Sequence, residues 1–170
     1  MAQHRGEDGG KPMAKEIERK FLVRGEDWKA HGPGVPCRQG YLSRLPERTV
    51  RVRVLGNRGY LTVKGATIRA SRPEFEYEIP VADAKTLLAE LCEKPLIEKR
   101  RFVVEYAGRR WEVDEFFGEN LGLVVAEVEL ESEDAQIELP PWVDREVTDD
   151  PRFYNASLAA HPYRSWKTRE

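Results

Sequence analysis

Two carboxylates and an ammonium group alternate at every second position near the start of the chain, in the segment Glu16-Ile17-Glu18-Arg19-Lys20. On a β-strand, residues two apart share one face, so Glu16, Glu18 and Lys20 would point the same way. At a separation of about 7 Å, the two carboxylates repel each other by roughly 2 kcal/mol if the effective dielectric constant is near 20. A partly buried pair of this kind requires a cation.

The same alternation recurs along the chain, and each later segment carries mostly one sign of charge. The alternating basic residues are Arg51, Arg53, Lys64, Lys99 and Arg101. The alternating acidic residues are Glu76, Glu78, Glu112, Asp114, Glu127 and Glu129. Apolar residues occupy most of the positions between them, which predicts antiparallel strands with one charged face and one apolar face.

Two arrangements explain a sheet with one charged face. A sheet with one face in water also alternates charged and apolar residues. Such a face normally mixes both signs and accepts Ser, Thr and Gln, which are nearly absent from these positions. Same-sign neighbours on a free surface also cost a few tenths of a kcal/mol across strands. The pattern therefore favours a barrel whose interior is charged.

A charged interior of this composition suits a highly charged anion bound together with a divalent metal ion. Mg²⁺ and Mn²⁺ bind through a few carboxylates together with substrate phosphates and waters. Arginine forks and lysine ammonium groups bind phosphate oxygens. A polyphosphate with its metal ion satisfies both sets of side chains. The sequence has no P-loop, so a glycine-rich cradle is not expected to hold the phosphate.

The ordered series of charged pairs resembles the CYTH, or triphosphate tunnel metalloenzyme, superfamily, and in particular its short bacterial inorganic triphosphatases. The matching motifs are Glu16-x-Glu18-x-Lys20, Arg51-x-Arg53, Val63-Lys64, Glu76-x-Glu78, Lys99-x-Arg101, Glu112-x-Asp114 and Glu127-x-Glu129. The resemblance runs from about Glu16 to Tyr154-Asn155. It implies a mainly β (α+β) fold, in which eight antiparallel strands close into a tunnel with a few covering helices.

The resemblance also implies roles for the charged residues. The metal ligands, for Mg²⁺ or Mn²⁺, would be Glu16, Glu18, Glu127 and Glu129. The phosphate-binding residues would be Lys20, Arg51, Arg53, Lys64, Lys99 and Arg101. The remaining acids of the tunnel would be Glu76, Glu78, Glu112 and Asp114.

The segment Arg38-Gln39-Gly40-Tyr41-Leu42 also resembles bacterial members of the superfamily. By this resemblance, Tyr41 would act together with Lys64 as a catalytic pair that prepares the attacking water. A phenol has an ordinary pKa near 10, so Tyr41 can serve as a base only if a neighbouring ammonium group lowers its pKa.

The implied activity is metal-dependent hydrolysis of a triphosphate. Inorganic triphosphate, cleaved to diphosphate and phosphate, is the expected substrate, because no reader of a nucleotide base is evident. Two alternative activities within the superfamily bind the triphosphate group in the same way. They are cyclisation of ATP by a class IV-type adenylate cyclase and hydrolysis of thiamine triphosphate. A different class is a module that binds polyphosphate or RNA ends without catalysis.

Composition limits the remaining possibilities. The chain has 170 residues, which suits one domain, and 34% of them are charged. A net charge of -2 argues against a general nucleic-acid binder. Cys37 and Cys92 lie far apart without a C-x-x-C motif, which argues against zinc and favours the reducing cytoplasm. No signal peptide or membrane span is visible, so no membrane partner is expected. The resemblance implies a small-molecule triphosphate as partner, and a homodimer is compatible with the sequence.

We expect a single tunnel domain over residues 13–163, a disordered extension over residues 1–12 and a polar tail over residues 164–170. The turn residues Gly56-Asn57-Arg58-Gly59 predict a hairpin between two strands.

Three helices are expected between or after the strands. Residues 82–93 predict an amphipathic helix on the outside of the barrel, with Asp83 as its cap. Residues 132–138 are expected to form a short helix. Asp150-Pro151 would open a third helix that continues through Ala159, with proline at its first position.

Overall fold

A computed structural model describes residues 15–69 and 71–166, and for Lys15 and Glu16 it describes the backbone alone. The predicted extension over residues 1–12 and the end of the predicted tail lie outside the described residues. No helix among the residues described is long and apolar enough to cross a membrane.

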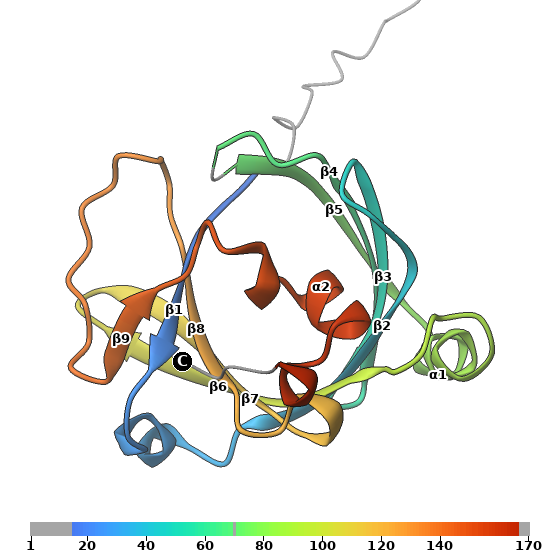
Figure 1. Cartoon of the computed structure of the whole chain (residues 1–170), viewed down its shortest axis with the longest axis horizontal. Coiled ribbons are helices and arrows are strands. Elements are labelled where there is room, and N and C mark those ends of the chain that lie inside the picture. The colour runs from blue at the N-terminus through green and yellow to red at the C-terminus, as the bar shows by residue number, and fades with distance from the viewer. Residues whose placement is uncertain (1–14, 70, 167–170) are drawn as a thin grey trace, which may run out of the picture.

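One antiparallel sheet of nine strands makes up most of the described structure (Figure 1). The strands are β1 Lys15–Val23, β2 Val35–Leu45, β3 Arg48–Leu55, β4 Arg58–Gly65, β5 Ser71–Ile79, β6 Ile97–Tyr106, β7 Arg109–Phe116, β8 Val124–Glu129 and β9 Val143–Glu146. The first eight form a ring in the order β5-β4-β3-β2-β6-β7-β8-β1, which closes because β1 also pairs with β5. The predicted closed tunnel of eight antiparallel strands is confirmed, and β9 adds a short ninth strand beside β1.

The ring carries its charge on the inside, as the alternation predicts. Arg51 and Arg53 of β3 are buried on the inner face, while Val52 and Val54 between and beyond them pack outward against a helix. Much of the apolar core therefore lies outside the ring. On the side of β1, β6, β7 and β8 it includes Trp111, which packs edge-on against Trp142 at a ring distance of 5.8 Å.

The first predicted helix is confirmed as α1 Val81–Glu90, which lies on the outside of the ring (Figure 1). Ala84 and Leu88 are its buried residues, and they belong to the same apolar cluster as Val52 and Val54 of β3. Pro80 rather than Asp83 occupies the N-cap position. Asp83 lies in the first turn, where a negative charge still complements the helix dipole.

The predicted hairpin is also confirmed. Strands β3 and β4 pair up to Leu55 and Arg58, and Gly56 between them has a φ of 60°. This left-handed conformation is costly for residues with a Cβ atom, so glycine is favoured in the turn.

The two other helix predictions are wrong: the first helix is absent, and the second differs in extent. Residues 132–138 form turns and irregular backbone, because none of them is fully buried and tertiary packing therefore offsets little of the cost of starting a short helix. The predicted helix after Asp150 breaks into a 3₁₀ turn, Pro151–Phe153, and a helix, α2 Asn155–Ala160. Tyr154 between them is extended, and the carbonyl of Phe153 accepts a hydrogen bond from Lys20 Nζ at 3.2 Å.

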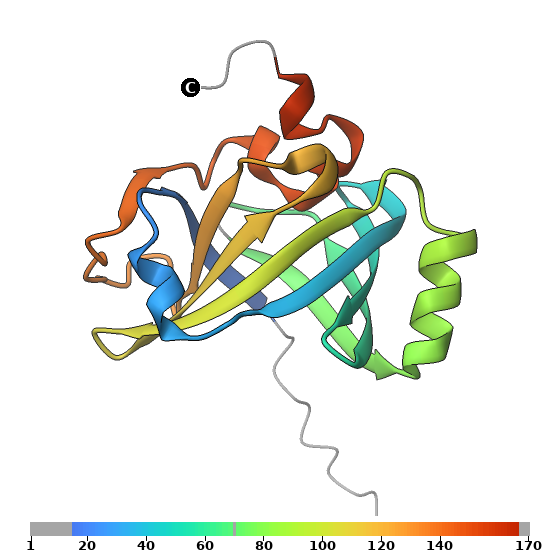
Figure 2. The same cartoon turned by 90° about the horizontal axis from the view of Figure 1, so that it is seen from below.

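The segment that carries α2 closes one end of the ring. Figure 1 shows α2 inside the outline of the ring, and Figure 2 shows it at the end of the tunnel opposite the β6–β7 hairpin. Trp166 packs edge-on against Phe153 at a ring distance of 5.2 Å, which anchors the segment after α2. Both cysteines are buried and free.

Candidate active site

Two cavities lie inside the ring, and they share part of their lining. The first, of about 610 Å³, lies under α2, and the second, of about 400 Å³, extends toward the β6–β7 hairpin. Four residues line both cavities, and we call them the waist residues: Glu18, Arg51, Lys64 and Asn155. Three of the four were predicted from the charge pattern, whereas Asn155 was not.

The predicted metal ligands come from two neighbouring strands. In the pairing of β1 with β8, Glu18 lies opposite Glu129, and Lys20 lies opposite Glu127. Glu18, Glu127 and Glu129 all line the second cavity. The backbone of Glu16 pairs with Arg72 of β5, and its side chain lies outside the described part of the structure.

Lys20 is buried and surrounded by oxygen atoms. Its Nζ lies 3.3 Å from Oε1 of Glu127, and it donates to the carbonyl of Phe153. Burial is the largest single influence on the pKa of Lys20 and lowers it, but Glu127 and Glu18 together outweigh burial and raise the pKa above its ordinary value. Burial likewise opposes ionisation of Glu127, yet Lys20 and the nearby cations bring the pKa of Glu127 down to about 2.

The two arginines of β3 share one acid. Arg53 Nη2 donates to Oε1 of Glu76 at 3.0 Å, and Arg51 Nη2 lies 3.7 Å from the same oxygen. Burial, followed by repulsion from Arg51 and Arg101, lowers the pKa of Arg53. The Nε atoms of Arg51 and Arg53 are buried without a hydrogen-bond partner among the described residues. Positive charge and donors therefore exceed what the acids in contact satisfy, which favours an anion.

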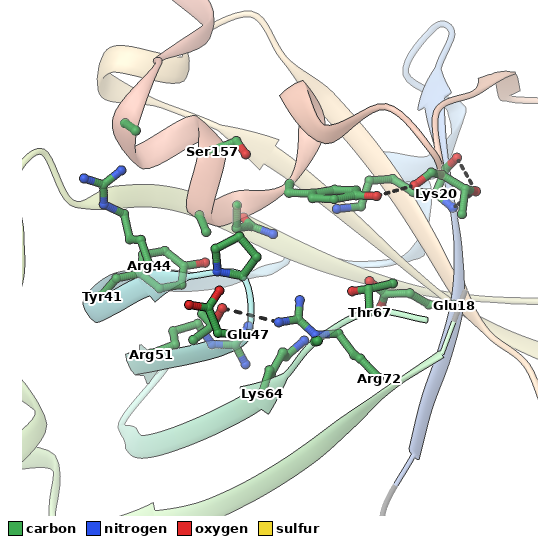
Figure 3. A pocket seen from close by; sticks show the side chains of 18 of the residues that line it. Glu18, Lys20, Tyr41, Arg44, Glu47, Arg51, Lys64, Thr67, Arg72 and Ser157 are labelled. Atoms are coloured by element: carbon green, nitrogen blue, oxygen red, sulfur yellow. Dashed lines mark hydrogen bonds between the residues drawn. The ribbon is translucent and has the colours of Figure 1, made fainter. Parts of the chain in front are cut away.

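Arg72 joins these cations, although sequence reasoning missed it. Figure 3 shows Arg51, Lys64 and Arg72 gathered on one side of the first cavity, with Ser157 of α2 on the opposite side. Arg72 is held by hydrogen bonds to the carbonyl of Gly65 at 3.1 Å and to Oγ1 of Thr49 at 3.3 Å. Arg72 lies two residues before Glu74 on β5, with Pro73 between them, so the two side chains belong to the same face of the strand. This spacing is the sequence signal that could have identified Arg72.

Lys99, Arg101, Glu112 and Asp114 form an ion cluster on β6 and β7. Asp114 accepts from Lys99 Nζ at 2.6 Å and from Arg101 Nε at 2.8 Å, and Glu112 lies 2.5 Å from Arg101 Nη1. Despite its burial, these cations hold the pKa of Asp114 well below its usual range. Burial outweighs Asp114 and lowers the pKa of Lys99. Arg101 and Glu112 line the second cavity, whereas Lys99 and Asp114 lie beneath the surface of both.

Glu78 lies apart from the other acids of the candidate site. Its side chain is exposed, it lies 3.6 Å from Arg58, and it lines neither cavity. Its pairing partner on β4 is Tyr60, whose ring lies 5.7 Å from the guanidinium of Arg53.

Tyr41 lines the first cavity together with Lys64, and it is 3% exposed. Arg51, Lys20 and other cations favour ionisation of its phenol, but burial is the larger influence and raises the pKa of Tyr41 above its ordinary value. Burial therefore favours the neutral phenol over the phenolate that a base would need, and a neutral phenol can donate a hydrogen bond.

The acids can be tested for their fit to a metal ion by their chemistry. Among the residues described, no three His, Cys, Asp or Glu side chains stand ready to hold a metal ion unaided. Glu18, Glu127 and Glu129 nevertheless offer carboxylate oxygens to one cavity that arginines also line. Hard divalent cations commonly use one or two carboxylates and complete their coordination with substrate phosphates and water. The donor set fits such an ion bound together with a phosphate.

Comparison with known proteins agrees with this geometry. Residues 14–157 match the model of the CYTH domain. An inorganic triphosphatase of Acetivibrio thermocellus is 52% identical over 155 residues, which cover 91% of this chain and 99% of that protein. An inorganic triphosphatase of Nitrosomonas europaea is 38% identical over 149 residues, covering 85% and 96% of the two chains.

A similar architecture is found among solved structures. A crystal structure of an inorganic triphosphatase superposes with a TM-score of 0.62 at 35% identity, covering 88% of this chain and 97% of the other. The matched region includes the ring of eight strands and reaches into α2. The chain belongs to the CYTH domain family.

Proposed function

We propose that this protein is a metal-dependent triphosphatase that hydrolyses inorganic triphosphate to diphosphate and phosphate. The observation that carries the proposal is the lining of the second cavity, which combines carboxylates of β1 and β8 with guanidinium and ammonium groups of β3 and β4. The two related inorganic triphosphatases support the same activity.

Glu18 and Glu129, together with Glu16 and Glu127, would hold Mg²⁺ or Mn²⁺. The pairing of β1 with β8, which sets Glu18 opposite Glu129 and Lys20 opposite Glu127, supports this assignment of metal ligands. When bound, the metal ion supplies Lewis-acid charge at phosphate oxygens, which stabilises charge that develops in the reaction.

The basic residues bind the phosphates and orient the chain of the substrate. Arg51 and Arg53 supply guanidinium donors, including buried Nε groups, and Lys64 and Arg72 add charge from the neighbouring strands. Lys20 and Arg101 contribute from the other side of the ring, and Lys99 adds its charge from beneath the lining. In phosphoryl transfer, such positioning and electrostatic stabilisation supply most of the catalysis.

Tyr41 acts as a protonated donor beside the transferred phosphate, in a pair with Lys64. Burial favours the neutral phenol, and both side chains line the first cavity. We assign the proton of the attacking water to the carboxylate and phosphate oxygens of the site rather than to Tyr41.

An assay of substrates tests the proposal. Phosphate release is measured from tripolyphosphate, ATP and thiamine triphosphate, each with Mg²⁺ or Mn²⁺ and with EDTA. We expect tripolyphosphate to have the highest kcat/KM and EDTA to abolish turnover. Cyclic AMP as the main product from ATP, or binding of tripolyphosphate without turnover, would contradict the proposal. The homodimer stays a prediction from the sequence, and sedimentation velocity checks it.

A further inference from the structure

We infer that Asn155 is a further substrate-binding residue, whose side-chain amino group donates a hydrogen bond to the triphosphate at the waist between the two cavities. The inference rests on the proposed function, and it concerns a residue outside the alternating charge pattern.

The position of Asn155 is the first observation. It lines both cavities together with Glu18, Arg51 and Lys64. Every other residue described in the lining of the second cavity belongs to a strand of the ring, so Asn155 alone brings α2 into contact with that cavity. A triphosphate that reaches Arg51 and Lys64 from either cavity passes within the surface that Asn155 helps to form.

The orientation of the amide is the second observation. Lys99 Nζ donates to Oδ1 of Asn155 at 3.4 Å, and it also pairs with Asp114. An ammonium group has donors and no acceptor, so it requires the oxygen end of the amide. Lys99 lies beneath the surface of both cavities, and this arrangement turns the amino end of Asn155 away from Lys99 and toward the cavities.

The backbone on the N-terminal side of Asn155 is held in place as well. The carbonyl of Phe153 accepts from Lys20 Nζ, and the hydroxyl of Tyr154 donates to the carbonyl of Thr148 at 3.1 Å. These contacts fix the two residues that precede Asn155 before substrate binds. A donor that is already in place costs little reorganisation during the reaction.

The neutral amide of Asn155, in contact with the Lys99 ammonium group, is suited to donate a hydrogen bond to a phosphate oxygen. The contact with the Lys99 ammonium polarises the amide and strengthens its amino group as a donor. Hydrogen bonds to charged groups contribute more than neutral ones, so loss of this donor has a measurable effect on substrate binding.

Two substitutions at Asn155 separate substrate binding from a purely structural role. Asn155→Ala removes the whole amide. Asn155→Asp keeps an oxygen for Lys99 but presents a carboxylate, in place of the amino group, to the phosphates. If Asn155 only anchors α2 through Lys99, the Asp variant must equal or exceed the Ala variant. If it binds substrate, the Asp variant must be the weaker enzyme.

We expect kcat/KM for tripolyphosphate to fall about tenfold to a hundredfold in Asn155→Ala and further in Asn155→Asp. A second readout is the rise in melting temperature that tripolyphosphate causes in EDTA, which we expect to shrink in the same order. The Asp variant should keep its melting temperature without ligand, because Lys99 retains a partner. Asn57→Ala and Asn57→Asp, in the exposed β3–β4 turn, are the matched controls and should behave as the unsubstituted protein does.

The outcomes distinguish the two proposals. An unsubstituted protein that does not hydrolyse tripolyphosphate contradicts the proposed function. An active protein whose Asp variant equals or exceeds its Ala variant, in kcat/KM or in the ligand-induced shift, overturns the assignment of Asn155 alone. If the Ala variant does not fold, the Asp variant is compared with the unsubstituted protein in the EDTA experiment, where an unchanged shift overturns the assignment.

Discussion

At the scale of single residues, the charge on the inner face is not interchangeable. Glu18 is the one acid at the waist, whereas Glu98 of the same ring is exposed and lies 3.9 Å from Arg38. Two glutamates on different strands of the ring thus have different surroundings. Their difference gives a direct test of the metal-binding role.

Glu18→Gln keeps the size and hydrogen-bonding capacity of the side chain but removes its charge. We expect it to lower kcat/KM for tripolyphosphate by more than about a hundredfold, since Glu18 is a proposed metal ligand and lines the same cavity as Arg51. Glu98→Gln is the matched control and should leave turnover unchanged. Steady-state phosphate release measures both, and full activity of Glu18→Gln would contradict a role in metal binding.

Acid stability is a second prediction at this scale. The pKa of Glu127 falls from 4.5 to about 2 in the folded protein, because Lys20 and nearby cations stabilise its charged form. Between these values the unfolded chain binds a proton that the folded chain does not, so stability is lost as the pH falls through this window. Glu127→Gln should lower the melting temperature at pH 7 and flatten its decline between about pH 4.5 and 2.

Melting curves from pH 7 to pH 2 measure this effect, with Glu105→Gln, an exposed residue of β6, as control. Parallel declines for the unsubstituted protein and Glu127→Gln would show that Glu127 does not contribute.

The sequence predicted site residues where charge repeats on a strand and missed them where it does not. Alternation placed Arg51 and Arg53 inside, because residues two apart share a face. Arg72 was hidden by Pro73, and Asn155 is a neutral residue on a short helix. Alternation also cannot predict whether an inward side chain reaches the cavity surface. Lys99 lies beneath the lining, where it forms an ion pair with Asp114 on the neighbouring strand.

At the scale of elements, helix α1 and the short helix α2 serve different purposes. The periodicity of residues 82–93 predicted α1 because an apolar face must cover the outer valines of β3. The break before α2 could not be predicted, since it depends on Lys20, which is distant in sequence and binds the carbonyl of Phe153. Local patterns thus predict elements that cover the ring, whereas tertiary contacts shape the segment that enters it.

Because α1 covers the outside of the ring, a substitution of its buried residues should lower the stability of the protein without lowering its catalytic activity. Leu88→Ala should lower the free energy of unfolding by about 2–5 kcal/mol, because Leu88 is 1% exposed in the cluster between α1 and β3. Leu91→Ala is the control, since Leu91 is 64% exposed, and it should change stability by less than about 0.5 kcal/mol. Urea unfolding measures both, and kcat at low temperature should be the same in both variants.

At the scale of the whole molecule, the ring reverses the usual arrangement of a small barrel. Acids and bases line the cavities of the interior, and two apolar clusters pack outside against α1, the 3₁₀ turn Asp27–His31 and the segment around Trp142. The sequence predicted this reversal, because apolar residues fill the positions between the charges. It did not predict how the interior divides into two cavities, because the division depends on how far α2 enters the ring.

A charged interior should cost stability that an anion restores. Burial and repulsion from Arg51 and Arg101 lower the pKa of Arg53, so the fold disfavours the charged form of this side chain. Arg53→Gln removes that cost and should therefore leave the melting temperature without ligand unchanged or higher. The same change removes a phosphate donor, so the rise caused by tripolyphosphate in EDTA should shrink.

At a hundred times its dissociation constant, a ligand that binds only the folded state adds about 2.7 kcal/mol to stability, so the shift in the unsubstituted protein is measurable by scanning calorimetry. Arg58→Gln, at an exposed position at the start of β4, carries the same loss of charge and should keep the full shift. A fall of several degrees in the ligand-free melting temperature of Arg53→Gln would show instead that its contact with Glu76 stabilises the ring more than the repulsion among the arginines weakens it. Stability and binding would then rest on the same contact, and the interior could not be described as a strained site that its substrate relaxes.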